Sequence, residues 1–388
     1  MAEQWMRRQG RWIGFGLLAC AVSACQVVPR RPQAPPPPPQ PSFRAPLPPP
    51  APAERPLVAL LAPQTGPNAN VGTSIANAAR LAVTDIGGDR VRLAVYDSGT
   101  GAAAAAQQAL NDGAKLIVGP LLAEEVRAVA PVAERARVPV IAFSNDASVA
   151  GGHVYLLGYA PEQSIARVVG FASAKGATRF GGLVPRGVYG QRAGDGFSQS
   201  VGPAGGRLVA LDAYDRKPGA ALTAAGALGR KGPFDAVLIA DTVRVAGTIV
   251  PVLRRTGGGT PLLLGTELWA SDAGLAASLV LRGSLFAAAS DNLYRPLAAK
   301  YKARFGQSPY RLASLGYDAM LLVAKIAQGW RPGTPFPEDQ LRDPGGFSGI
   351  DGAFRFTREG LAERMLEVRQ VTAQGVVVVS PAPATFDR

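Results

Sequence analysis

Apolar and polar positions along residues 57–330 follow two alternating periods. Short continuous apolar runs such as LVALLA and VPVIAF predict strands that are covered on both faces. Between these runs, apolar residues recur at the spacing of a helix face, as in residues 73–86. In the first third, the expected strands are 57–62, 91–96, 115–118 and 138–143, and the expected helices are 73–86, 102–111 and 121–135. Such alternation with short Gly or Pro connections predicts a doubly wound parallel sheet.

The same rhythm restarts after Gly151, which predicts a second parallel sheet. Its expected strands are 154–157, 180–184, 207–213, 235–240 and 261–264, and its expected helices are 161–173, 190–201, 220–228 and 243–256. Two more helices at 296–305 and 311–328 precede short strands of antiparallel character at 353–356, 366–370 and 376–379. We therefore expect an α/β domain at 57–388 with two lobes. Lobe 1 takes 57–157 and part of 285–330, and lobe 2 takes 158–284 and the strands within 346–380.

The first 24 residues have a different pattern. Arg7, Arg8 and Arg11 form a basic head, and residues 12–21 are apolar or small. This run of about ten residues is too short for a membrane-spanning helix, which needs roughly 20. A basic head, a short apolar core and small residues at the end are typical of an export signal.

The signal ends in V-S-A-C, which resembles the bacterial lipobox, with Cys25 as the lipidated residue. The alternative is an ordinary small-residue cleavage site with an incidental Cys. Because Cys20 would leave with the signal, the remaining thiol could form neither a disulfide nor a metal site by itself. In lipoproteins an Asp after the Cys favours the inner membrane. Gln26 stands there in this chain, so the resemblance implies a lipid anchor on the periplasmic face of the outer membrane.

Residues 25–56 predict a disordered tether, since 14 of the 28 residues from 29 to 56 are Pro. Such a segment favours polyproline II at about 3.1 Å per residue and could reach on the order of 80 Å. It is interpreted as a passive spacer, with a Pro-motif docking site as the alternative.

Charge and residue types narrow the function classes. Residues 1–56 carry seven Arg and two Glu, or +5 of the net +13, which leaves +8 for the domain. The basic residues are scattered, and the signal exports the chain, so we expect no nucleic-acid partner. The domain has a single His, His153, so we expect neither a His-based triad nor a metal site. The stretch GPNANVG lacks the G-K-[ST] ending of a P-loop. We expect no catalytic residues, metal or cofactor.

Six stretches in order resemble the type I periplasmic-binding fold of branched-chain amino-acid receptors. They are LLAPQTGPNANVG (60–72), AAAAAQQALNDGAKLIVGPLLAEEVRAVAPVA (102–133), VPVIAFSND (138–146), GYAPEQSIARVVGFA (158–172), VPRGVYGQRAGDGF (184–197) and RLASLGYDAMLLVA (311–324). The tail at 346–371 is similar to that of the penicillin-binding protein activator branch, whose members are lipid-anchored.

Ligands of open parallel sheets bind outside the carboxyl ends of the strands. The loops expected there are 64–70, 119–122, 144–146, 186–189, 241–242 and 266–269. In the amino-acid receptors, small hydroxyl residues of the second and third loops hold the ligand carboxylate, and an acid near the last loop holds its amine. The resemblance therefore implies these ligand-binding candidates: Thr65, Gly66, Asn70, Leu121, Leu122, Ser144, Asn145, Tyr189, Asp241 and Glu267.

The second loop departs from the receptor pattern. It reads GPLLAEE, with Leu121 and Leu122 where the receptors offer Ser, so a donor for the ligand carboxylate is lost. An unpaired carboxylate in a closed cleft costs several kcal/mol. The sequence is therefore interpreted as an outer-membrane lipoprotein that binds and activates a bifunctional class A penicillin-binding protein, a peptidoglycan synthase. The alternative is a substrate-binding lipoprotein of an ABC transporter for branched-chain amino acids or related amides, with a small amino-acid-like ligand.

Overall fold

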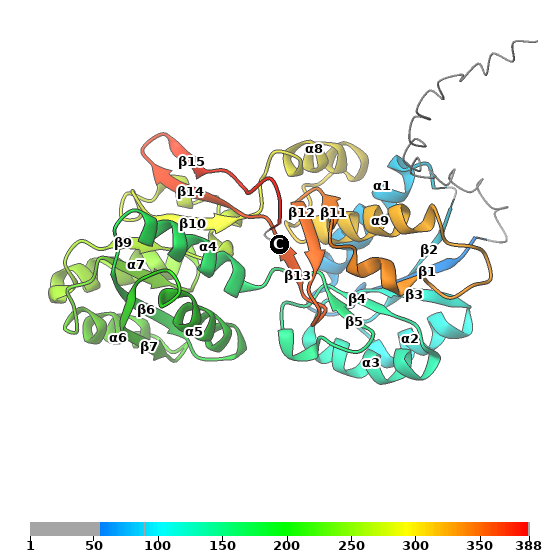
Figure 1. Cartoon of the computed structure of the whole chain (residues 1–388), viewed down its shortest axis with the longest axis horizontal. Coiled ribbons are helices and arrows are strands. Elements are labelled where there is room, and N and C mark those ends of the chain that lie inside the picture. Colours follow the sequence, from blue (N-terminus) through cyan, green and yellow to red (C-terminus); the bar gives the residue numbers. More distant parts are fainter. Residues whose placement is uncertain (1–54, 89, 387–388) are drawn as a thin grey trace, which may run out of the picture. The chain divides into compact units, whose positions relative to one another are not determined.

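The computed structural model describes residues 55–88 and 90–386 (Figure 1). The predicted signal, Cys25 and nearly all of the predicted tether lie outside the described residues, so those three expectations stay predictions. Within the described residues, no helix is long and apolar enough to cross a membrane.

Lobe 1 is built on a five-stranded, all-parallel sheet. Its strands lie in the order β2-β1-β3-β4-β5. They are β1 (Leu57–Ala62), β2 (Arg92–Asp97), β3 (Ala114–Val118), β4 (Val140–Ala142) and β5 (Val154–Leu156). The apolar runs predicted four of these strands here, whereas the strand at 154–157 was expected in the second sheet and in fact pairs with β4. The surrounding helices are α1 (Ala69–Asp85), α2 (Ala102–Asn111), α3 (Ala123–Ala136), α8 (Tyr294–Phe305) and α9 (Ala313–Ala327).

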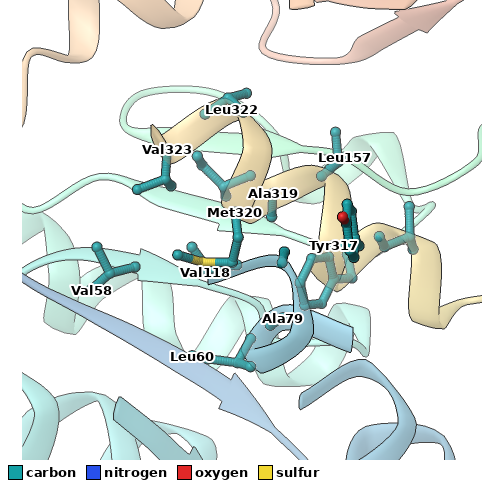
Figure 2. Packing of buried hydrophobic residues seen from close by; sticks show 14 of the residues in the cluster. Val58, Leu60, Ala79, Val118, Leu157, Tyr317, Ala319, Met320, Leu322 and Val323 are labelled. Atoms are coloured by element: carbon teal, nitrogen blue, oxygen red, sulfur yellow. The ribbon is translucent and has the colours of Figure 1, made fainter. Parts of the chain in front are cut away.

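The central strand β1 shows why its sequence is apolar without interruption. Val58 and Leu60 pack in the core with α1 and α9, whereas Ala59 and Leu61 pack in the core with α2 and α3. Successive side chains of a strand point to opposite faces, so a strand covered on both faces has no position for a polar residue. Figure 2 shows the first of these cores, in which Met320 of α9 lies among side chains of the sheet and α1.

Lobe 2 holds a seven-stranded sheet in the order β15-β14-β10-β9-β8-β6-β7. Its strands are β6 (Arg179–Pro185), β7 (Arg207–Tyr214), β8 (Ala236–Ile239), β9 (Leu262–Leu264), β10 (Leu285–Ala288), β14 (Glu367–Thr372) and β15 (Gly375–Ser380). The first five are parallel, and β14 and β15 are antiparallel to their neighbours. The covering helices are α4 (Pro161–Ala174), α5 (Val188–Val201), α6 (Ala220–Gly229) and α7 (Val243–Leu253).

The division into lobes differs from the expected one in two segments. Strand β10 belongs to the sheet of lobe 2, because its residues pair with both β9 and β14. A small antiparallel sheet of β11 (Phe347–Gly349), β12 (Gly352–Phe356) and β13 (Ala362–Arg364) belongs to lobe 1. Its Phe347, Phe354 and Phe356 are buried in the same core as α9. The antiparallel character expected for the C-terminal strands is thus present, but it is split between the lobes.

Both lobes use a glycine to bring a helix close to the strand before it. A Cβ on Gly72 would lie 1.8 Å from the Pro63 carbonyl oxygen, and one on Gly190 would lie 1.5 Å from that of Pro185. Only glycine permits these approaches. The first turns of α1 and α5 therefore start directly above the carboxyl ends of β1 and β6. Helix α1 begins at Ala69, four residues before the expected start.

The chain crosses between the lobes three times, after β5, after β10 and after β13. Two buried arginines that flank the third crossing, Arg364 at the end of β13 and Arg369 in β14, hold the other two crossings. Arg364 Nη2 donates to the Leu157 carbonyl at 2.8 Å, and Arg369 Nη2 donates to the Ala289 carbonyl at 2.6 Å. Arg369 Nη1 also forms an ion pair with Asp291 at 2.6 Å.

These arginines belong to a continuous set of polar side chains that we call the crossing network. It consists of Tyr159, Asp291, Arg311, Asp318, Asp351, Arg364 and Arg369. Asp318 and Asp351 are fully buried. Asp318 accepts from the Ile350 amide at 2.5 Å and lies 3.8 Å from Arg364 Nη1. Burial, and next the Asp351 carboxylate, raise the pKa of Asp318 to about 7.

This raised pKa predicts the sign of a pH dependence. Between about pH 4 and pH 7, folded Asp318 keeps a proton that the unfolded chain has released, so its contribution to the free energy of unfolding falls as pH rises through that window. The fall is at most about 1.4 kcal/mol per pH unit. Asp318→Asn cannot titrate, and urea unfolding from pH 5 to pH 8 should show a shallower decline than the wild type. Asp215→Asn, at an exposed carboxylate, should keep the wild-type slope; equal slopes for Asp318→Asn and wild type would contradict the expectation.

Candidate functional site

A cavity of about 470 Å³ lies where the carboxyl ends of strands from both lobes meet. We call it the interlobe cavity. Lobe 1 contributes the loops after β1, β3 and β4, and lobe 2 contributes the segment after β9. The first two crossings and the start of α9 supply the remainder. The lining residues are Asn68, Val71, Leu121, Leu122, Phe143, Asn145, Tyr159, Glu267, Leu268, Ala270, Ser271, Ala288, Ala289, Arg311 and Leu312.

The wall from lobe 1 is mainly apolar, with Val71, Leu121, Leu122 and Phe143 facing the cavity. The loop that carries the two leucines is placed by Gly119. This glycine has a φ of 85°, and a Cβ on it would lie 2.0 Å from the Leu61 carbonyl oxygen. A glycine is therefore needed for the loop to leave β3 at this position.

The backbone donors of this loop are already occupied by the chain's own carboxylate. Glu125 accepts from the amides of Leu121 and Leu122 at 3.2 and 3.0 Å, and from the Ser98 hydroxyl at 2.9 Å. A Glu three residues into a helix commonly caps its start in this way. These two amides, which lie directly before α3, are therefore satisfied from within the chain and are not free to bind an anion.

The positive group at the cavity is Arg311, whose side chain is 16% exposed. Its Nη1 contacts Asp351 at 2.6 Å and Ser314 Oγ at 2.8 Å, and its guanidinium lies 4.2 Å from the Tyr294 ring centre. Its Nη2 is 3.9 Å from Asp291, which is beyond hydrogen-bond distance. Arg311 therefore joins the cavity to the crossing network and keeps donor capacity for a ligand acceptor.

The wall from lobe 2 carries Glu267. Its carboxylate accepts from the Ser164 hydroxyl at 2.6 Å and from the Tyr189 hydroxyl at 3.1 Å. Burial raises the pKa of Glu267, although both hydroxyl donors act in the other direction. No cation pairs with it among the described residues, so Glu267 has unused acceptor capacity for a ligand donor.

The structure brings four of the ten predicted ligand residues to this cavity: Leu121, Leu122, Asn145 and Glu267. The resemblance to amino-acid receptors thus locates Glu267 beside the cavity, where an acid was expected. Tyr189 does not line the cavity but donates a hydrogen bond to Glu267, which does. Ser144 is buried, and its hydroxyl accepts from the Asp146 amide at 3.1 Å.

The other four predicted residues do not line the cavity. Asp241 is buried in lobe 2, where it accepts from the Tyr214 hydroxyl at 2.6 Å. Thr65 donates to Asp97 at 2.7 Å, and Gly66 and Asn70 are exposed beside it. Thr65 and Asp241 do follow strand ends, as expected, but their side chains bond to other residues of the chain, and Asn70 lies in the first turn of α1.

Sequence reasoning missed Tyr159 and Arg311, which border the cavity from the crossings. Both lie in stretches that carry the family resemblance, GYAPEQ and RLASLGYDAM. They could have been predicted as site residues from their position, because both lie near points where the chain passes from one lobe to the other. Within the described residues, no three His, Cys, Asp or Glu side chains are grouped to hold a metal ion.

Residues 57–375 match the family model described as periplasmic binding protein, and the chain belongs to this family. Among solved structures, a putative branched-chain amino acid ABC transporter protein from Rhodospirillum rubrum is 17% identical with a TM-score of 0.74, over 84% of this chain and 100% of that one. A solute binding protein of an ABC transporter from Rhodopseudomonas palustris BisB5, in complex with 3,4-dihydroxy benzoic acid, is 19% identical with a TM-score of 0.66, over 86% and 99%. LivJ from Streptococcus pneumoniae, in complex with isoleucine, is 20% identical with a TM-score of 0.61, over 84% and 100%.

At these identities the likeness shows the fold: two lobes with parallel sheets, in common with binding proteins rather than enzymes. A curated relative, the uncharacterized protein RP748 of Rickettsia prowazekii (strain Madrid E), is 24% identical over 136 residues. That match spans 34% of this chain and 36% of the relative's length.

The role of Glu125 predicts an effect on stability. Glu125→Ala leaves the Leu121 and Leu122 amides without their acceptor, and the loss of a cap typically costs about 1 kcal/mol of unfolding free energy. The neighbouring exposed Glu124 is a matched control, and Glu124→Ala should stay within about 0.5 kcal/mol of the wild type. Denaturant unfolding measures both; equal losses for the two variants would refute the assigned cap.

Proposed function

We propose that this chain is the solute-binding protein of an ABC importer and that it binds a small, largely apolar carboxylic acid that also carries a hydrogen-bond donor. The observation that supports the proposal most is that one cavity is bordered by apolar side chains, by Arg311 and by Glu267. The guanidinium suits the ligand's acid group, and the carboxylate suits an amine or hydroxyl.

The two polar groups come from different parts of the molecule. Arg311 lies beside the crossings and Glu267 lies on lobe 2. The apolar wall that contains Leu121 and Leu122 lies on lobe 1. A ligand that fills the cavity contacts all three, so its binding free energy favours the arrangement in which the lobes lie together. This is how a solute-binding protein reports occupancy to its transporter.

The chemistry differs from that expected of an amino-acid receptor in one respect. The amides of Leu121 and Leu122, directly before α3, are bound by Glu125 and are not free to hold a ligand carboxylate. The acid group of the ligand is therefore assigned to Arg311. Hydroxylated benzoates and branched-chain amino acids both satisfy the class, and relatives of similar fold have 3,4-dihydroxy benzoic acid and isoleucine bound.

A calorimetric titration of full-length protein in detergent tests the proposal. The ligands are 3,4-dihydroxybenzoate, benzoate and isoleucine. We expect at least one of the two donor-bearing acids to bind with micromolar affinity. A hydrogen bond to a charged group contributes about 1.5–3 kcal/mol, so Glu267→Gln should weaken that ligand roughly tenfold to 100-fold. The same substitution should change the affinity for benzoate, which has no donor, by less than about threefold.

Glu124→Gln, on the exposed start of α3, is the control and should bind like the wild type. Heat from none of these acids or their close analogues at millimolar concentration would refute the proposal. Equal weakening of all ligands by Glu267→Gln would refute the role of Glu267.

A second candidate function is the activation of a class A penicillin-binding protein from a lipid anchor on the outer membrane. The observation that favours it is the second loop, in which Leu121 and Leu122 stand where the amino-acid receptors offer Ser and Glu125 occupies the two leucine amides. In this case the same titrations give no heat, and addition of the protein raises the rate of glycan polymerisation by the synthase.

A further inference from the structure

The outer strand of lobe 2, β15, has an unusual edge. It reads GVVVVS, it pairs on one side with β14, and no strand among the described residues pairs with its other side. Its valines, Val376 to Val379, have exposed fractions of 37, 42, 51 and 36%. Natural edge strands normally carry charges or proline, because a bare apolar edge invites pairing with another chain. Figure 1 shows β15 as the outermost arrow of this sheet.

The other edges of the two large sheets are protected. Strand β7 ends the sheet of lobe 2 with Arg207 and with Asp212, which pairs with Lys231 at 2.6 Å. In lobe 1, β2 carries a charged residue at each end, and β5 is covered because the Leu156 amide donates to the Gly360 carbonyl at 2.7 Å. Strand β15 alone of these four edges has neither a charged residue nor a covering backbone hydrogen bond among the described residues. Its ladder with β14 has a register shift only near its end, between Val378 and Ser380.

Both ends of β15 are fixed in place. The Thr372 hydroxyl donates to the Gly375 carbonyl at 2.8 Å at the start of the strand. Arg167 Nη2 donates to Ser380 Oγ at 2.7 Å and to the Pro381 carbonyl at 3.1 Å at its end. The strand is therefore presented as a formed template, so pairing with it orders little additional chain.

We propose that β15 is an interaction edge for a second copy of this chain, and that two copies join their lobe 2 sheets by antiparallel pairing of β15 with β15. A two-fold axis at Val377 sets Val377 opposite Val377 of the second copy and Val376 opposite Val378. An interface of this kind uses the same patch on both subunits.

The composition of β15 indicates which kind of strand pairs with it. In this register Val376, Val377 and Val378 each face a valine, and β-branched cross-strand pairs each contribute about 0.2–1 kcal/mol. No charged side chain of one strand faces a like charge of the other. A polar or charged partner strand would leave these valines without apolar neighbours, so a copy of the same strand is the complementary partner.

The size of the edge sets the expected affinity. Pairing of six residues buries less than the roughly 1,200 Å² of a standard stable interface. The dimer should therefore be weak, with a dissociation constant on the order of tens to hundreds of micromolar. Joining two sheets of seven strands makes one continuous sheet across the two copies.

Sedimentation equilibrium of full-length protein in density-matched detergent tests this dimer, from about 5 to 200 µM. We expect a reversible shift from monomer to dimer mass in the wild type. Val377→Lys should weaken association at least tenfold, because two lysines would meet across the axis. Val377→Thr keeps the β-branched shape and should weaken it less.

The control is Leu222→Lys, since Leu222 on α6 is 41% exposed and closely matches Val377 at 42%. It should dimerise like the wild type, and circular dichroism melts show whether each variant is folded. A wild type that stays monomeric to 200 µM, or a dimer that Val377→Lys leaves unchanged, would overturn the proposal.

Discussion

Two buried arginines that flank the last crossing, Arg364 and Arg369, tie the three chain crossings to one another. Each donates to a backbone carbonyl of another crossing, at Leu157 and at Ala289. Removing one partner of a buried ion pair typically costs about 3–5 kcal/mol of unfolding free energy, because the remaining charge is buried without a partner and without contact to water. The crossing network therefore specifies where the two lobes can join.

The network also makes one side of the interlobe cavity. Tyr159 and Arg311 belong to both, since Arg311 pairs with buried Asp351 while it borders the cavity. A ligand bound to Arg311 would thus lie against the crossings, because Tyr159 and Ala289 line the same cavity. Glu267 lies on lobe 2 and the apolar wall with Leu121 and Leu122 lies on lobe 1, so one ligand in the cavity can contact both lobes. The Leu121 and Leu122 amides, which Glu125 occupies, then separate this cavity from that expected of an amino-acid receptor.

Much of the fold was predictable because burial on both faces leaves a direct trace in the sequence. LVALLA can only be apolar throughout if both faces of β1 are covered, and β1 is indeed covered on both. The order of strands, helices and family motifs predicted two parallel sheets, and the structure confirms them. The lobe to which 347–364 belongs was not predictable, because it depends on phenylalanines that pack against α9, far away in sequence.

The position of the cavity was predictable, but its lining only in part. Loops after strands can be found from the pattern, and Leu121, Leu122, Asn145 and Glu267 of those loops do line the interlobe cavity; that they bind a ligand stays a prediction. Pairs such as Thr65 with Asp97 or Arg311 with Asp351 join residues 32 and 40 positions apart, and no local pattern reports them. The cap by Glu125 could have been predicted from GPLLAEE, because an acid three residues into a helix commonly caps its start.

The account makes one central claim, that a single ligand contacts both lobes beside the crossing network. Hydrogen exchange of the full-length protein, with and without saturating 3,4-dihydroxybenzoate or isoleucine, tests it most directly. The account predicts slower exchange in residues 119–125 of lobe 1 and in residues 265–271 of lobe 2 with the same ligand. Slower exchange in only one of these segments, or in neither, would contradict it.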